Sequence, residues 1–123
     1  MPILPASDLA AAATFYTAKL GFELAGQWTN DDGTPNFAIV QMGDVTLGLS
    51  ASERDGSGED WAAYVYVEDI DAFTDQILGR GVKVLRGPED SFYHCREVEV
   101  ADPHGNRLCI AQDLKSGADG PGL

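Results

Sequence analysis

Two carboxylates and two thiols are the first residues in this chain whose chemistry and spacing suggest a site. Glu97 and Glu99 occupy alternate positions in a run of strand-forming residues, so they share one face and could act as an acid and a base. A polar sheet face shows the same spacing, and we favour that interpretation. Cys95 or Cys109 as a nucleophile would need a nearby base, which the spacing does not supply. We interpret Cys109 as a buried, inert thiol.

The two histidines are the next candidates, because imidazole is a common metal ligand. His94 is adjacent to Cys95, and neighbouring strand residues point to opposite faces. His104 falls in a predicted hairpin turn, where we expect a solvated side chain. The cysteines match no zinc-binding spacing, and no Gly-rich run has the setting of a phosphate loop. We therefore predict no metal and no other cofactor.

Aromatic residues point more clearly to a ligand. Tyr64 and Tyr66 share one face of a predicted strand that begins at Trp61, while Phe37 opens another strand and Tyr93 precedes a third. Ring faces bind planar heterocycles, and carboxylates nearby would attract a cationic tail. The alternative is packing in a core or a dimer interface. We prefer packing for Tyr66 and leave both alternatives open for the others.

Composition limits the classes of partner. The 123 residues fit one domain, and 44% apolar content permits a proper core. The net charge of −12 repels nucleic-acid phosphates and anionic lipid, so we expect neither as a partner. It favours cationic ligands, although solubility alone accounts for most of the carboxylates. No signal peptide or membrane-length apolar run is visible, and two cysteines suit a reducing compartment, so we expect a cytoplasmic protein.

Two similar helices must position these residues. One begins after Asp8 and ends at Gly21, and the other begins after Asp69 and ends at Gly81. Aspartate caps a helix N-terminus, and glycine readily adopts the left-handed conformation that ends a helix. The two aspartates and the two glycines are separated by nearly the same number of residues. This agreement indicates a duplicated unit.

Each helix is set among predicted strands in the order βαβββ. The strands are expected at 3–6, 22–25, 37–42 and 45–50 in the first unit, and at 61–67, 82–85, 95–101 and 107–111 in the second. We predict an α+β fold of two βαβββ repeats with curved mixed sheets. One domain would cover 1–114, with repeat one at 1–52, a linker at 53–60 and repeat two at 61–114, before a flexible tail at 115–123.

Alternation along the strands separates two faces of each sheet. One face should pack under the helices, and the other is more polar than a core would be. If Asp102 lies opposite Asn106 in the hairpin, Glu99 faces Cys109 on this second face. The second face must therefore meet a ligand groove, a partner or water.

The repeats and three segments resemble the glyoxalase/bleomycin-resistance/dioxygenase superfamily over roughly residues 2–112, and more specifically its bleomycin-resistance branch. The segments are Pro2 to Asp8 leading to Leu20-Gly21-Phe22, Asp44-Val45-Thr46-Leu47 with Ser50-Ala51, and Arg96-Glu97-Val98 running into Asp102-Pro103-His104-Gly105-Asn106. The resemblance implies sheets curled into half-cups, a dimer that usually exchanges elements, and a ligand in grooves at its interface. It also implies that the ligand is sequestered without chemistry.

Enzymes of this superfamily usually hold a divalent metal, and the resemblance places its ligands at four positions. Those positions fall near Met1, at Leu47 or Gly48, at Ala62 and at Cys109. Of these only Cys109 has a ligating side chain, and one thiolate does not make a site. The lyase, epoxide-opening and ring-cleaving chemistries of the superfamily would then lack their metal.

We therefore expect a metal-free homodimer that sequesters a planar, cationic antibiotic or metabolite in a groove at its interface. The ligand-binding candidates, several of them matched to the branch, are Asn36, Phe37, Ser50, Trp61, Tyr64, Tyr93, Glu97 and Glu99. A metal-dependent lyase, isomerase or dioxygenase is the alternative, and catalysis is left undecided. A module whose groove has lost its ligand is the third hypothesis.

Overall fold

The fold is described from a computed structural model over residues 1–53 and 61–114, so most of the predicted linker at 53–60 and the tail at 115–123 lie outside the described residues. Its elements follow the βαβββ order twice. Those of the first repeat are β1 (Ile3–Ala6), α1 (Leu9–Thr14), the π-helical turn η1 (Phe15–Lys19), β2 (Glu23–Thr29), β3 (Pro35–Met42) and β4 (Val45–Ala51). Those of the second are β5 (Trp61–Tyr66), α2 (Ile70–Gly79), β6 (Val84–Asp90), β7 (Cys95–Ala101) and β8 (Arg107–Asp113).

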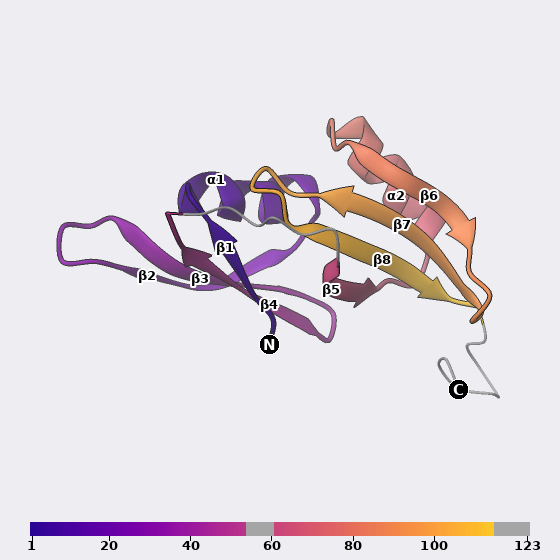
Figure 1. Ribbon diagram of the computed structural model, residues 1–123, viewed down its shortest axis with the longest axis horizontal. Coiled ribbons are helices and arrows are strands. Elements are labelled where there is room, and N and C mark those ends of the chain that lie inside the picture. The colour runs from indigo at the N-terminus through magenta and orange to yellow at the C-terminus, as the bar shows by residue number, and fades with distance from the viewer. Residues whose placement is uncertain (54–60, 115–123) are drawn as a thin grey trace.

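Each repeat forms one four-stranded mixed sheet of the same topology. Sheet A has the order β1-β4-β3-β2, and sheet B has the equivalent order β5-β8-β7-β6. The first strand of each repeat runs parallel to the last, and all other pairs are antiparallel. The two sheets lie side by side with the helices along one side of the molecule (Figure 1). The predicted α+β fold of two βαβββ repeats is confirmed.

The helix signals in the sequence act as predicted. Asp8 and Asp69 are N-caps whose carboxylates accept from the amides of Ala11 and Ala72. Gly21 and Gly81 adopt φ values of 89° and 84°, the left-handed conformation expected after a helix. The first helix differs in one respect, because it widens at η1, where the amide of Leu20 bonds to the carbonyl of Phe15.

Strands β2 and β6 continue furthest past their predicted ends. The sequence predicts that these strands end at Ala25 and Leu85, shortly before Gly26 and Gly87. In the structure β2 continues through Gly26 to Thr29, and β6 continues through Gly87 to Asp90. Both glycines lie beside register shifts, so they are irregular positions inside a strand and do not end it.

One continuous core lies between the sheets and the helices. Alternate residues of the strands are buried beneath α1, η1 and α2, including Val40 and Leu49 in sheet A and Val98 and Ile110 in sheet B. Tyr16 and Ile77 are completely buried from the helix side. The opposite face of each sheet carries no helix, and we call it the open face of that sheet (Figure 1).

The hairpin between β7 and β8 joins the two repeats. Asp102 accepts hydrogen bonds from the amides of His104 and Asn106, which shape the turn. Across the repeat boundary, Asn106 Nδ2 donates to the carbonyl of Pro5, and the amide of Asp8 donates to His104 Nε2 at 3.2 Å. The expectation of a solvated His104 was wrong. The residue is 5% exposed because the turn docks on the start of the first helix.

Candidate ligand-binding face

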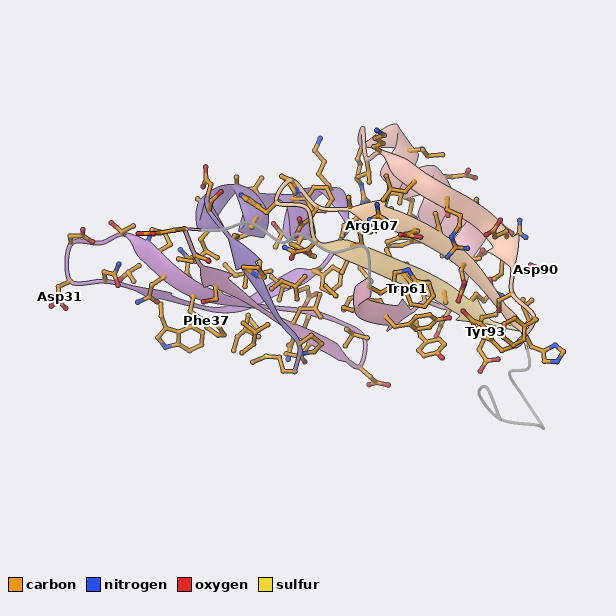
Figure 2. The ribbon with its side chains drawn as sticks, viewed as in Figure 1. Asp31, Phe37, Trp61, Asp90, Tyr93 and Arg107 are labelled. Atoms are coloured by element: carbon orange, nitrogen blue, oxygen red, sulfur yellow. The ribbon has the colours of Figure 1, made fainter. Side chains whose placement is uncertain are left out.

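The eight candidate residues divide between the two open faces. Trp61, Tyr64, Glu97 and Glu99 belong to strands of sheet B, and Tyr93 lies in the hairpin beside it. Phe37 and Ser50 are paired neighbours on strands β3 and β4 of sheet A. The labelled rings of Phe37, Trp61 and Tyr93 all lie on the side of the ribbon away from the helices (Figure 2). Asn36 is the exception, because its amide nitrogen donates to Asn30 Oδ1 in the β2–β3 hairpin.

Aromatic rings form a row along β5 on the open face of sheet B. The ring centroids of Trp61 and Tyr64 are 5.4 Å apart, and those of Tyr64 and Tyr66 are 5.1 Å apart. A register shift between Trp61 and Ala63 explains why residues three apart in sequence have neighbouring rings. Trp61 and Tyr66 keep 41% and 52% of their surface exposed. A planar molecule therefore has ring faces available to it here.

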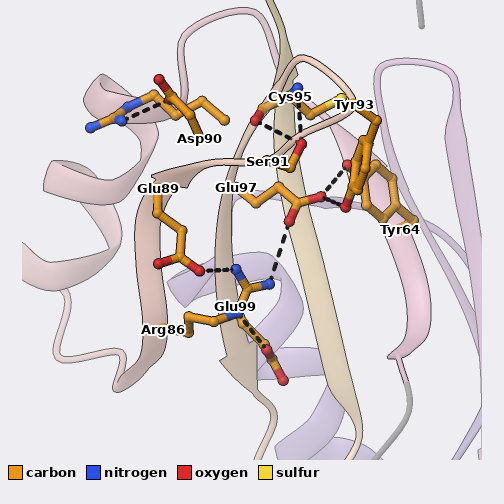
Figure 3. Close-up of polar contacts among 10 residues, drawn as sticks. Tyr64, Arg86, Glu89, Asp90, Ser91, Tyr93, Cys95, Glu97 and Glu99 are labelled. Atoms are coloured by element: carbon orange, nitrogen blue, oxygen red, sulfur yellow. Dashed lines mark hydrogen bonds and ion pairs between the residues drawn. The ribbon is translucent and has the colours of Figure 1, made fainter.

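Glu97 accepts hydrogen bonds from two tyrosines on this face. The hydroxyl of Tyr64 donates to Glu97 Oε2 at 2.7 Å, and the hydroxyl of Tyr93 donates to the same oxygen (Figure 3). Burial, and then the bond to Glu97, raise the pKa of both phenols. Burial alone would raise the pKa of Glu97, but the bonds from Tyr64, Tyr93 and Arg86 outweigh it and lower the pKa. The carboxylate therefore stays charged and the phenols stay protonated.

Arginines pair with the carboxylates on the same face. Arg86 contacts Glu97 at 3.4 Å, Glu99 at 3.2 Å, and Glu89 (Figure 3). Arg107 contacts Glu99 at 3.4 Å. The side chains of Glu97 and Glu99 are only 4% and 11% exposed. The predicted polar face exists, and its two inner carboxylates lie beneath other side chains.

The predicted facing of Glu99 and Cys109 is confirmed in the register of β7 and β8. Cys109 is fully buried, and burial, followed by the charge of Glu97, raises its pKa to about 12. Cys95 is buried too, and both cysteines are free. A thiol with this pKa is protonated at neutral pH and is neither a nucleophile nor a ready metal ligand.

Sheet A carries a more apolar open face, part of which the sequence did not reveal. Trp28 pairs with Phe37 across β2 and β3, with ring centroids 5.8 Å apart. The Phe37 ring lies over Gly48, where an added Cβ would come within 2.9 Å of it, and Ile3 lies beside the same glycine. Trp28 was missed because the predicted strand ended at Ala25, three residues before it.

Hollows also occur away from both open faces. One lies along the first helix, between Asp8, Phe15, Lys19 and Pro103, and another lies near Ser7 and Glu53. Neither contains a candidate residue. Within residues 1–53 and 61–114, the candidate residues of the two sheets lie on the open sheet faces.

The residues at the superfamily's metal positions do not fit a divalent ion. Leu47, Gly48 and Ala62 have no ligating side-chain atoms, Met1 is a weak thioether ligand, and the buried Cys109 thiol holds its proton. Over residues 1–53 and 61–114, no three His, Cys, Asp or Glu side chains gather as a metal ion would require. Within the same residues, no helix has the length and apolarity to cross a bilayer.

Comparison with known proteins agrees with the topology. The family model described as Glyoxalase/Bleomycin resistance protein/Dioxygenase superfamily matches residues 2–110, so the chain belongs to that superfamily. Comparison with curated proteins gives no match.

Solved structures share the fold at low sequence identity. TioX from Micromonospora sp. ML1 is 19% identical, with a TM-score of 0.76 over 91% of this chain and 95% of that one. TnmS3, an antibiotic-binding protein from Streptomyces sp. CB03234, is 23% identical, with a TM-score of 0.69 over 90% and 91%. A bleomycin-binding protein complexed with bleomycin is 23% identical, with a TM-score of 0.72 over 91% and 95%. At these identities the likeness shows the fold.

Proposed function

We propose that this protein binds a planar small molecule, an antibiotic or a metabolite, and sequesters it unchanged and without a metal. The observation that carries the proposal is the row of rings formed by Trp61, Tyr64 and Tyr66 on the open face of sheet B. Tyr93 is fastened beside this row through Glu97. Exposed rings held in fixed positions are what stacking requires, because little freedom is lost on binding. The bleomycin-binding protein and TnmS3 share the fold and bind antibiotics, which is consistent with this proposal.

A cationic group on the ligand is part of the proposal. The net charge of −12 favours a cation at long range. Glu97 and Glu99 already accept hydrogen bonds from tyrosines and arginines, so neither offers a free carboxylate. The cationic group of the ligand would therefore lie over the ring faces and at the edge of the groove.

A homodimer would close the groove. Ile3, Trp28, Trp61 and Tyr66 are large side chains that a single copy leaves 41–59% exposed. Burying such a surface against a second copy is favourable, and it would bring Phe37 and Ser50 of one copy toward the rings of the other. Asn36 would contact the ligand only at the edge of the groove. The free thiols of Cys95 and Cys109 are consistent with a cytoplasmic location.

The proposal is tested by metal analysis followed by titration in the same sample. We expect untagged protein to contain far less than one metal ion per chain, to bind metal-free or copper-loaded bleomycin saturably, and to release it with unchanged mass. Stoichiometric metal, or conversion of the ligand, would contradict the proposal and support the enzymes of the superfamily. Sedimentation of wild type and Trp28→Glu tests the dimer, because a charge on that face should dissociate it. An unchanged sedimentation coefficient would refute this interface.

A further inference from the structure

On the open face of sheet B, the guanidiniums of Arg86 and Arg107 lie nearer the surface than the carboxylates of Glu97 and Glu99. The side chains of Arg86 and Arg107 are 33% and 40% exposed, against 4% and 11% for Glu97 and Glu99. Glu89 is more exposed, at 55%, and it is bound to Arg86, which lies on the same edge strand β6. A molecule lying on this face therefore meets hydrogen-bond donors before it meets the inner carboxylates.

Glu99 holds the two arginines together. Its Oε2 accepts from Arg86 Nε at 3.2 Å and its Oε1 accepts from Arg107 Nη1 at 3.4 Å. Within residues 1–53 and 61–114, Arg86 uses three of its N–H groups on Glu89, Glu97 and Glu99, while Arg107 donates one hydrogen bond, to Glu99. A guanidinium carries five donors. Donors are therefore left over on both side chains, and most of them belong to Arg107.

These donors adjoin the row of rings. Arg107 is the cross-strand neighbour of Trp61 in the register of β5 and β8, and the two are labelled close together in Figure 2. Tyr64 is the next ring in the row, and its neighbour on β8 is Cys109, two residues along from Arg107. A planar molecule stacked on Trp61 would therefore have one edge at Arg107, with the ring of Tyr64 inclined beside it.

We infer that Arg107, with Arg86 behind it, binds hydrogen-bond acceptor atoms on the edge of the ligand ring, and that the ligand is a planar ring system bearing conjugated carbonyl oxygens. This inference rests on the proposed function and specifies the chemical class of its ligand. A neutral carbonyl suits the site better than a full anion, because the two arginines are outnumbered by Glu89, Glu97 and Glu99 and the chain carries a net charge of −12.

Two fluorescent probes separate this inference from the proposed function. Daunorubicin is a planar quinone with ring carbonyls and one amine, and acridine orange is a planar cation without oxygen. We expect wild type to bind both. Arg107→Gln should weaken daunorubicin binding roughly tenfold, the usual effect of losing a charge-assisted hydrogen bond, and should leave acridine orange binding equal or tighter. The daunorubicin affinity of Arg107→Lys should lie between those of wild type and Arg107→Gln, because lysine keeps the charge and loses the planar fork.

Arg96→Gln is the matched control. Arg96 is an arginine of similar exposure whose partners are Asp71 and Asp90, and its side chain lies on the helix side of β7. Arg96→Gln should leave the affinity for both probes unchanged. Unchanged thermal unfolding of each variant would verify that it folds. Equal weakening of both probes by Arg107→Gln, or no effect on daunorubicin, would overturn the inference and leave the binding function standing. Failure of wild type to bind either probe would overturn both.

Discussion

The hydroxyl of Tyr16, in the first repeat, donates a buried hydrogen bond of 2.8 Å to Asp102 Oδ2, in the hairpin of the second. Asp102 also receives bonds from the turn that it shapes, so one carboxylate both forms the hairpin and docks it. Burial, and then the nearby Asp102 charge, raise the pKa of Tyr16, which keeps it a donor. The hairpin segment Asp102–Asn106, which is part of the resemblance to the superfamily, therefore joins the two repeats.

Tyr16→Phe should destabilise the protein by about 1–3 kcal/mol, because it leaves a buried carboxylate without one of its donors. Urea unfolding measures the change. Tyr66→Phe is the control, since its ring is half-exposed, and it should shift stability by less than about 0.5 kcal/mol. Equal effects of the two variants would show that the Tyr16 bond does not stabilise the docked repeats.

Gly87→Ala should lower the free energy of unfolding by about 2 kcal/mol or more. Gly87 has a φ of 85°, and a Cβ there would lie 2.2 Å from the carbonyl oxygen of Glu97. Gly79→Ala is the matched control, because that helical glycine has nothing within 4 Å of an added Cβ and should gain up to about 1 kcal/mol. Thermal unfolding of both variants checks the signs. A neutral Gly87→Ala would mean that β6 lies farther from β7.

Both thiols should resist alkylation in the folded protein. Burial raises the pKa of Cys109 to about 12, so its thiolate is scarce at pH 8, and Cys95 is shielded by its own burial. Mass spectrometry after iodoacetamide treatment should find no adduct in buffer and two in urea. Phe92→Cys, at a position that is 94% exposed, should add one adduct in buffer. Rapid labelling of Cys109 in the folded state would contradict the burial of this thiol beneath the side chains of the open face.

The stabilisation that Glu97 contributes should decrease as pH falls. Its folded pKa lies below the ordinary value, because the bonds from Tyr64, Tyr93 and Arg86 outweigh burial. As pH falls, the unfolded chain is protonated first, so the stabilisation is complete above the ordinary glutamate pKa of about 4.3 and is lost below it.

Wild type should accordingly be more stable than Glu97→Gln at neutral pH, and the difference should shrink as pH falls below about 4. Urea midpoints of the two proteins across a pH series measure it. A difference that stays constant down to pH of about 3 would show that the Glu97 carboxylate is not held in its charged form.

Local sequence signals were enough to predict the fold. Aspartate caps and left-handed glycines act within a few residues of where they stand, so the helices begin and end as Asp8, Asp69, Gly21 and Gly81 indicated. Register followed from the hairpin turn, which correctly placed Glu99 opposite Cys109.

The missed features depend on contacts that are distant in sequence. His104 is buried because the hairpin docks on the first helix, which no turn signal reveals. Arg86 was missed because its strand was ended too early at Leu85, and its three carboxylate partners lie on β6 and β7. The sequence indicated which aromatic and polar residues form the row of rings and the polar face. It did not show which arginine pairs with which carboxylate, because most of those pairs join different strands.

The most direct test of ligand binding on sheet B uses the two tryptophans of the chain, Trp28 and Trp61. In Trp28→Phe, Trp61 is the only tryptophan and reports on the ring row. Titration of this variant with bleomycin should quench its fluorescence saturably, with the affinity of wild type, because a planar group stacks on Trp61. No quenching in Trp28→Phe, together with saturable quenching in Trp61→Phe, would place the ligand on sheet A and contradict the account.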